Sequence, residues 1–218
     1  MDVSDAVTSR RSIRAFLDDP VPAELIGELL ERAARAPSGG NLQPWRIFVI
    51  TADVMPAFRE HLAAGDFEAP GYDIYPPNLI EPYRTNRYTV GEQMYALLGI
   101  ARDDKAGRLM RLAENYNFFG APVGMFCFVD RTMGPPQWSD LGMFLQTFML
   151  LAREAGLDTC AQEAWAMRSE AVADFVDAPD HLMLFCGMAI GRRDPDAAVN
   201  SLTSERQPLD EWATFVTP

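Results

Sequence analysis

The residues with the clearest capacity for chemistry are three arginines near the start of the chain. The segment SRRSIRAF contains Arg10, Arg11 and Arg14, two serine hydroxyls and no acidic residue. Guanidinium groups bind phosphate through paired, charge-assisted hydrogen bonds, and a hydroxyl adds a further donor. If the segment is extended, alternation places its first and last arginines on one side with Ser12 and turns Ile13 toward the core. Taken alone, the pattern favours a solvated basic edge over an anion site.

A second polar segment, PSGGNLQPW, covers residues 37–45. Its glycines let backbone amides approach a flat ligand, and its Ser, Asn and Gln side chains offer hydrogen bonds without charge. The composition allows neither a helix nor a strand. Taken alone, it favours an ordinary turn between a helix and a strand.

The familiar catalytic signatures are missing from the sequence. No GxGxxG, GxxxxGK or HExxH motif occurs, so no dinucleotide, P-loop or zincin site is predicted. His61 and His181 are the only histidines, and the acidic neighbours of His181 are typical of a turn or helix end. Cys160 has no histidine nearby in sequence and is interpreted as a small core residue. We expect no metal and no side-chain nucleophile.

Composition and charge exclude several classes of protein. The 218 residues are predicted to form one domain, residues 1–218. A formal net charge of −12 repels phosphate backbones and anionic lipid, so neither nucleic acid nor a membrane is an expected partner. Cys127, Cys160 and Cys186 are odd in number and widely spaced, which favours free buried thiols and a cytoplasmic location. The longest apolar stretch, Leu141 to Ala152, is too short to span a bilayer.

Hydrophobic periodicity predicts helices that alternate with a few strands. Helices are expected near residues 3–9, 22–36, 52–65, 92–100, 105–115, 139–155 and 169–176, and strands near 45–51, 121–129, 159–165 and 182–190. The helix at 139–155 is apolar on nearly every face and is expected to be central. Residues 66–82 carry four prolines without a period, which is typical of a lid. The pattern predicts an α+β fold with a mixed sheet covered by helices.

The two polar segments become specific when they are read in order. RRSxRxF, then PVP opening a helix, then APSGGNxQPW leading into a strand, resembles the nitroreductase family of FMN enzymes. The second half matches too, with FGAP before a strand, GLDT before Gln162 and Glu163, and Asn200 followed by RQPL. The resemblance covers nearly the whole chain and is least diagnostic over residues 66–114. It implies the nitroreductase-like fold, with a mostly antiparallel sheet, and a domain-exchanged homodimer.

The resemblance assigns the opening arginines to the cofactor. Arg10, Arg11 and Ser12 match residues that contact the FMN phosphate and ribityl chain, and Arg206 matches a C-terminal arginine on the phosphate. Arg14 matches a basic residue near the flavin pyrimidine. A fixed positive charge there would stabilise the anionic reduced flavin.

Two further segments complete the implied cofactor site. The residues that match a loop reaching the FMN of the partner subunit are Pro37, Ser38, Gly39 and Asn41. Gln162 and Glu163 match a segment whose backbone lies against the flavin ring, and the small Ala164 leaves room for that approach. The sequence departs from some relatives at Ser204, where a second basic residue can occur, and at Ala161, which replaces a proline.

The implied reaction passes a hydride from NAD(P)H to FMN and then to a nitroaromatic or quinone-type acceptor in the same pocket. The chemistry takes place on FMN, so no catalytic side chain is predicted. Reductive dehalogenation, flavin fragmentation or dehydrogenation would use the same fold and cofactor, and a flavin-binding protein without turnover is the alternative of a different class.

The acceptor pocket is expected in the variable middle of the chain. Tyr83, Arg84 and Arg87 are the predicted lining, and they cluster with Tyr72, Tyr75 and Tyr88. Aromatic and cationic side chains suit a small flat aromatic acceptor, including a carboxylated one. A tyrosine-rich surface loop ordered by dimer contacts explains the same cluster equally well.

Overall fold

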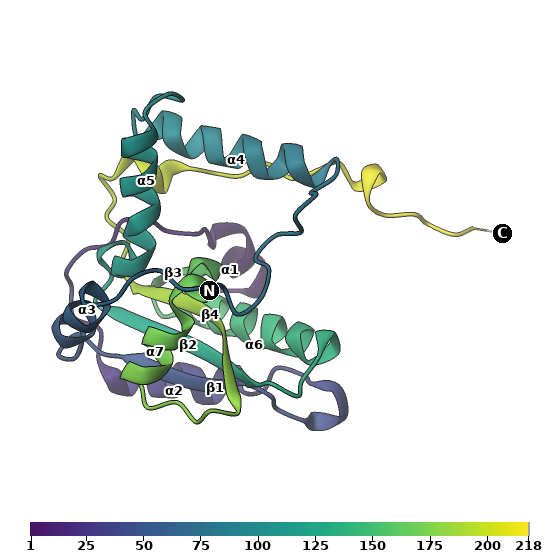
Figure 1. The fold of residues 1–218 in the computed structure, drawn as a ribbon. Helices are drawn as coiled ribbons and strands as arrows, with labels where there is room; N and C mark the ends of the chain where they lie inside the picture. Colours follow the sequence, from purple (N-terminus) through teal and green to yellow (C-terminus); the bar gives the residue numbers. More distant parts are fainter. Residues whose placement is uncertain (218) are drawn as a thin grey trace.

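A four-stranded antiparallel sheet organises the chain, with helices on both of its faces (Figure 1). The computed structural model describes residues 1–217. The strands are β1 (Arg46–Ile50), β2 (Val123–Asp130), β3 (Asp158–Gln162) and β4 (Leu182–Gly191), in the order β1-β2-β4-β3. Each neighbouring pair is antiparallel, so the predicted mixed sheet is wrong for the named strands. Among the described residues, a single isolated bridge, Ser12 to Thr159, is parallel.

Most predicted helices are confirmed within a few residues. The α-helices are α1 (Val3–Ser9), α2 (Ala23–Ala33), α3 (Met55–Ala63), α4 (Tyr83–Leu97), α5 (Lys105–Ala113), α6 (Pro135–Glu154) and α7 (Ser169–Phe175). Short 3-10 turns are η1 (Gly39–Asn41), η2 (Glu114–Gly120), η3 (Glu163–Arg168), η4 (Ala198–Ser201) and η5 (Leu209–Glu211). No helix within residues 1–217 is long and apolar enough to cross a membrane.

Two helix predictions need correction. Helix α4 begins at Tyr83 rather than near Glu92, and it contains no buried residue. Because a helix without a buried face carries no apolar period, its first half gives no signal in the sequence. The central position expected for α6 is confirmed, but its apolar side chains do not all face the core. Its Phe144 and Phe148 are buried against the sheet, whereas Met143 is exposed.

Two shorter elements also differ from expectation. The segment 37–44, expected to be neither helix nor strand, contains the 3-10 turn η1, in which Gly40 has a φ of 59°. The strand expected over residues 159–165 ends at Gln162, and η3 follows. The chain turns there because Trp165 inserts beneath the sheet and becomes fully buried. Tertiary packing therefore overrides the local preference of this segment for an extended conformation.

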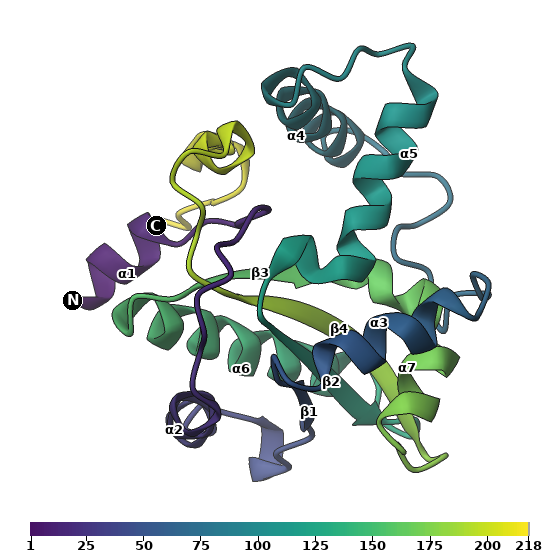
Figure 2. The same ribbon diagram turned by 90° about the vertical axis from the view of Figure 1, so that its left-hand side faces the viewer.

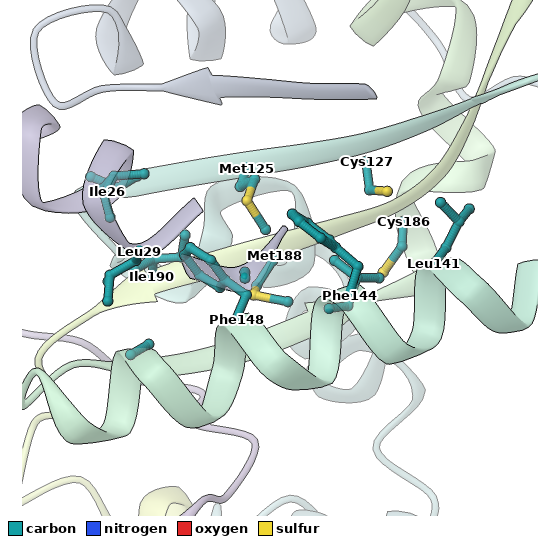
Figure 3. Close-up of a cluster of buried hydrophobic side chains, with 14 of the residues drawn as sticks. Ile26, Leu29, Met125, Cys127, Leu141, Phe144, Phe148, Cys186, Met188 and Ile190 are labelled. Atoms are coloured by element: carbon teal, nitrogen blue, oxygen red, sulfur yellow. The ribbon is translucent and has the colours of Figure 1, made fainter. Parts of the chain in front are cut away.

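Two hydrophobic clusters hold the helices to the two faces of the sheet. On one face, α2 and α6 pack on alternate residues of β2 and β4. Figure 3 shows Phe144 and Phe148 of α6 directed at Met125, Met188 and their neighbours on the strands. On the other face, α3, α7 and η3 enclose a second cluster that contains five phenylalanines and Trp165 among its buried residues. The sheet is thus covered on both faces. Its edge strands are therefore fixed in place, and so are the segments that pair with them.

The close packing of η3 depends on a glycine in β4. A Cβ atom at Gly187 would lie 2.1 Å from Cδ1 of Trp165, closer than real Cβ contacts allow. Trp165 also packs against Phe118 at a centroid distance of 4.7 Å and against Phe126 at 5.0 Å. The indole therefore lies directly on the strand, and this contact fixes the segment that follows β3.

The arginine segment lies along the outer edge of β3, where β3 begins (Figure 2). The Ile13 amide donates to the Thr159 carbonyl at 3.0 Å, and Ser12 forms a bridge with the same residue. The Ile13 side chain is fully buried, as the alternation predicted. The extended conformation of the arginines is therefore fixed by the sheet.

Asn200 joins this segment to the C-terminal part of the chain. Its Oδ1 accepts a hydrogen bond from the Arg14 amide at 2.9 Å. Its Nδ2 donates to the carbonyls of Ala15 at 2.8 Å and Asp194 at 2.9 Å. The side chain is buried, so its amide must be paired within the protein. Asn200 thereby brings the residues that follow it beside the arginines.

Replacing Asn200 by alanine should destabilise the protein by about 2–4 kcal/mol, because three hydrogen bonds of about 1 kcal/mol each are lost. Equilibrium urea unfolding measures this change. Ser201→Ala is the matched control, since the exposed Ser201 hydroxyl donates only to the Ala198 carbonyl. The control should change stability by less than about 0.5 kcal/mol. Equal losses in the two variants would contradict the linking role of Asn200.

Candidate functional site

The structure brings four predicted arginines around one cavity of about 280 Å³. The predicted residues that line it are Arg10, Arg11, Ser12, Arg14 and Arg206. Arg11 is among them, so the lining is not restricted to the alternate residues that an extended strand places on one side. Thr8, Thr203 and Ser204 add hydroxyl groups to the lining. We call this cavity the arginine pocket.

The arginine pocket contains no acidic side chain, although the chain has 31 acidic residues. Among the described residues, none of its four arginines forms a salt bridge. Arg206 donates instead to the carbonyl and hydroxyl of Ser204, at 3.0 and 2.8 Å. Clustered like charges repel one another, and a bound anion offsets that repulsion. The pocket has the charge and the donors of an anion site.

Arg111 is a cation that the sequence interpretation missed. It is half-buried, and its Nη2 donates to the Arg14 carbonyl at 2.9 Å. Its guanidinium lies 4.9 Å from the centre of the Phe119 ring, and its buried Nε has no partner. Burial, followed by the nearby charge of Arg14, lowers the pKa of Arg111. No motif marks Arg111, because only the fold places α5 beside the arginine segment.

A second orphaned polar atom lies in the same region. Thr159 Oγ1 is buried without a partner, and Thr159 pairs with Ser12 at the edge of the sheet. Unpaired buried polar atoms are uncommon and call for a ligand, water or ion. Together with the unpaired cations, this atom indicates that the start of β3 is built to receive a polar, anionic molecule. These features fit the phosphate and ribityl chain of FMN.

The segment Gln162–Ala164 lies at the opposite end of β3 from the arginine segment. The distance along the strand from Thr159 to Gln162 is about 10 Å, at about 3.3 Å for each residue. Gln162 is buried, and its Nε2 donates to the Asn115 carbonyl at 2.7 Å. The Tyr116 hydroxyl donates to the Ala164 carbonyl at 3.1 Å. Asn115 and Tyr116 of η2 thus fix the segment, a role with no sequence motif.

Glu163 differs from its neighbours in the segment because it is exposed. Desolvation by the surrounding protein raises the pKa of the Glu163 carboxyl. No described residue forms a hydrogen bond or salt bridge with this carboxyl. The predicted function of the segment concerns its backbone, and the small Ala164 leaves that backbone accessible.

The loop of Pro37, Ser38, Gly39 and Asn41 is not part of the arginine pocket. The Gly39 amide donates to the Asp140 carboxylate at 3.2 Å, and Ser38 Oγ accepts from the Gln43 amide at 3.0 Å. Figures 1 and 2 both place this loop beside β1, on the far side of the sheet from the arginine segment. Within one chain, the loop and the arginines are separate.

A larger groove of about 860 Å³ lies between residues 76–81 and helix α4. Of the predicted acceptor residues, Arg84 and Arg87 line it and Tyr83 does not. Tyr72 is away from the groove, because its hydroxyl donates to the Phe185 carbonyl and its ring packs against Trp138. Tyr88 lines the groove, and Tyr75 contacts Arg87. We call this cavity the α4 groove.

The three cysteines and His181 occupy the kinds of position expected from the sequence. Cys127, Cys160 and Cys186 are buried free thiols. Burial raises the pKa of the Cys160 thiol, which makes a thiolate nucleophile unfavourable. His181 lies in the turn before β4, outside the arginine pocket and the α4 groove.

Comparison with known proteins gives a consistent result. The chain is 38% identical over 217 residues to a 4-nitrobenzoate reductase of Pseudomonas putida, covering 99% of this chain and 96% of that protein. It is 35% identical to a chloronitrobenzene nitroreductase of Comamonas testosteroni, covering 98% and 96%. The crystal structure of the FMN- and NADPH-dependent nitroreductase NfnB from Sphingopyxis sp. strain HMH superposes with a TM-score of 0.95 at 47% identity, covering 100% of both chains. The model of the nitroreductase family matches residues 7–192, and the chain belongs to that family.

Proposed function

We propose that this protein is an FMN-dependent oxidoreductase that uses NAD(P)H to reduce nitroaromatic or quinone-type acceptors. The observation that carries the proposal is the arginine pocket, which gathers four unpaired cations at the start of β3. Relatives that align along nearly the whole chain are nitroreductases of 4-nitrobenzoate and chloronitrobenzene. The structure that superposes most fully among those described above is FMN- and NADPH-dependent.

Each part of the site has a distinct task in this proposal. Arg10, Arg11 and Arg206 hold the phosphate, and Ser12 donates to the ribityl chain. FMN supplies the two-electron redox chemistry when it is bound. Arg14, with Arg111 behind its backbone, places positive charge where the cofactor becomes anionic. No side chain has to act as a nucleophile.

The second half of the site is the segment Gln162–Ala164, which we assign to the ring of the cofactor. The backbone of Gln162 and Glu163 forms a fixed wall at the end of β3, and Ala164 adds little bulk. The hydrogen bonds from η2 hold this wall in place before any ligand binds. Such preorganisation lowers the ordering cost of binding. A nicotinamide that stacks transiently in the same pocket needs no separate nucleotide-binding domain.

We also propose a domain-exchanged homodimer in the cytoplasm. Exposed apolar side chains include Leu109 and Met110 of α5, both 66% exposed, and Phe215 near the C-terminus, which is 77% exposed. The C-terminal segment extends away from the body of the chain (Figure 1). Extended arms with apolar residues are stabilised by packing on a partner. The loop with Ser38 and Gly39 would then meet the cofactor of the other subunit.

The proposed reaction predicts two spectral changes in the yellow holoprotein. Anaerobic addition of NADPH or NADH should bleach the flavin absorbance, and a nitroaromatic added next should restore it. Chromatography should detect the hydroxylamine product. A flavin that stays oxidised would favour a binding protein without turnover. Reoxidation by a halophenol but not by nitroaromatics or quinones would favour reductive dehalogenation.

Replacing Arg10 by alanine should weaken FMN binding roughly tenfold to 100-fold, because a charge-assisted contact to phosphate is lost. Fluorescence titration of the flavin-free protein measures the affinity. The affinity for riboflavin, which has no phosphate, should change much less. Arg59→Ala is the control, since Arg59 is exposed and outside the arginine pocket. An unchanged FMN affinity in the Arg10 variant would remove Arg10 from the phosphate site.

The homodimer proposal predicts that the protein sediments at twice its 24.3 kDa monomer mass. The double variant Trp212→Ala, Phe215→Ala should raise the dimer dissociation constant at least tenfold, because two large exposed aromatic side chains are removed. Glu60→Ala, which changes an exposed polar residue of α3, is the control and should leave the constant unchanged. A monomeric wild-type protein would overturn the proposal.

A further inference from the structure

Arg111 of α5 is a half-buried cation without a carboxylate partner. An arginine stays protonated at neutral pH even where burial, as here, lowers its pKa. Within residues 1–217 it forms no salt bridge. Glu114, the next acid along the chain, is exposed and does not pair with it. Moving a charge out of water without an opposite charge to pair with it is costly.

The contacts of Arg111 within the chain offset only part of that cost. Its Nη2 donates to the Arg14 carbonyl at 2.9 Å, a bond that a neutral amide side chain can also make. Its guanidinium lies 4.9 Å from the centre of the Phe119 ring, and its buried Nε has no partner. Phe119 has a φ of 54°, a strained conformation that proteins retain mainly where a site requires it. These features indicate that an anion outside the chain completes the surroundings of Arg111.

The segment that carries Arg111 contacts both halves of the candidate site. Arg111 itself holds the carbonyl of Arg14 in the arginine segment. A few residues later, the Asn115 carbonyl and the Tyr116 hydroxyl hold the Gln162–Ala164 segment, at 2.7 and 3.1 Å. The unpaired charge is therefore on the element that joins the two surfaces assigned to FMN.

The charge of Arg111 acts on the middle of β3 rather than only on its start. Burial raises the pKa of the Cys160 thiol, which lies in the middle of that strand. The positive charges of Arg14 and Arg111 oppose this rise more strongly than the charge of Arg10 does. Arg111 thus lies on the side of the cluster that leads toward the Gln162–Ala164 segment, which we assign to the ring of the cofactor.

We propose that Arg111 is a positioning residue for the cofactor, which fixes the backbone of Arg14 and raises the reduction potential of bound FMN with its own charge. Transfer of a hydride adds two electrons and one proton to oxidised FMN, so the ring gains one negative charge. A fixed positive charge stabilises the reduced form more than the oxidised form. The inference rests on the proposed function, from which it takes the presence of FMN beside Arg14.

The test measures the midpoint potential of FMN in the holoprotein by anaerobic equilibration with a reference dye. Arg111→Gln removes the charge and keeps an N–H donor. It should reduce the preference of the site for reduced over oxidised FMN about tenfold, which is a fall of about 30 mV for a two-electron couple. Arg111→Lys keeps the charge and should recover most of the loss. Arg108→Gln is the matched control on α5 and should change the preference less than about twofold, because Glu92 already balances the charge of Arg108.

Two further measurements on Arg111→Gln separate this role from a structural one. The flavin-free variant should resist urea at least as well as wild type, because an unpaired half-buried charge has been removed. Its affinity for oxidised FMN should change less than about threefold, because the oxidised ring is neutral. An unchanged potential or a clear loss of stability would overturn the inference. Weaker binding of FMN but not of riboflavin would also overturn it, since Arg111 would then serve the phosphate.

Failure of this inference can be told apart from failure of the proposed function. Dithionite reduces a bound flavin chemically, so the potentials can be measured whether or not NADPH is a donor. If NADPH fails to bleach wild type, the proposed reaction fails, while the potentials still decide the role of Arg111. If wild type binds no FMN, both proposals fail.

Discussion

The edge of β3 carries the one set of contacts on which the candidate site depends. The Ser12 bridge, the buried Ile13 and the Asn200 amide together fix the arginine segment against the sheet. Without them, several arginines with no acidic partner would separate, because like charges repel and water solvates each guanidinium well. The packed sheet thus supplies the free energy that keeps the cations together. An anion bound among the arginines would offset part of their mutual repulsion.

Strand β3 also sets the spacing between the two halves of the site. The cations gather where the strand begins, and the backbone of Gln162–Ala164 forms a wall where it ends. The wall is fixed from below by Trp165 against Gly187 and from the side by η2. A ligand with a phosphate at one end and a flat ring at the other needs such a separation of its two binding surfaces. The rigid strand provides it without any flexible joint.

Residues of helix α4 line two cavities, the arginine pocket and the α4 groove. One face meets the arginine pocket through Val90, and the other forms the α4 groove. The helix has no buried residue, and an ion pair between Glu92 and Arg108 joins it to the neighbouring helix α5. A helix of this kind can vary in sequence without disturbing the core.

The sequence by itself determined the elements with a strong apolar period and the family to which the chain belongs. It located α2, β2, β4 and the buried Ile13, because burial leaves a regular local pattern. It missed the first half of α4 and the turn at Trp165, where exposure or distant packing decides the conformation. It named Arg84 and Arg87 together, but only the tertiary structure showed that Glu81 balances the first. Arg111 could not be identified from the sequence, because its neighbour Arg14 is far away along the chain and their contact depends on the fold.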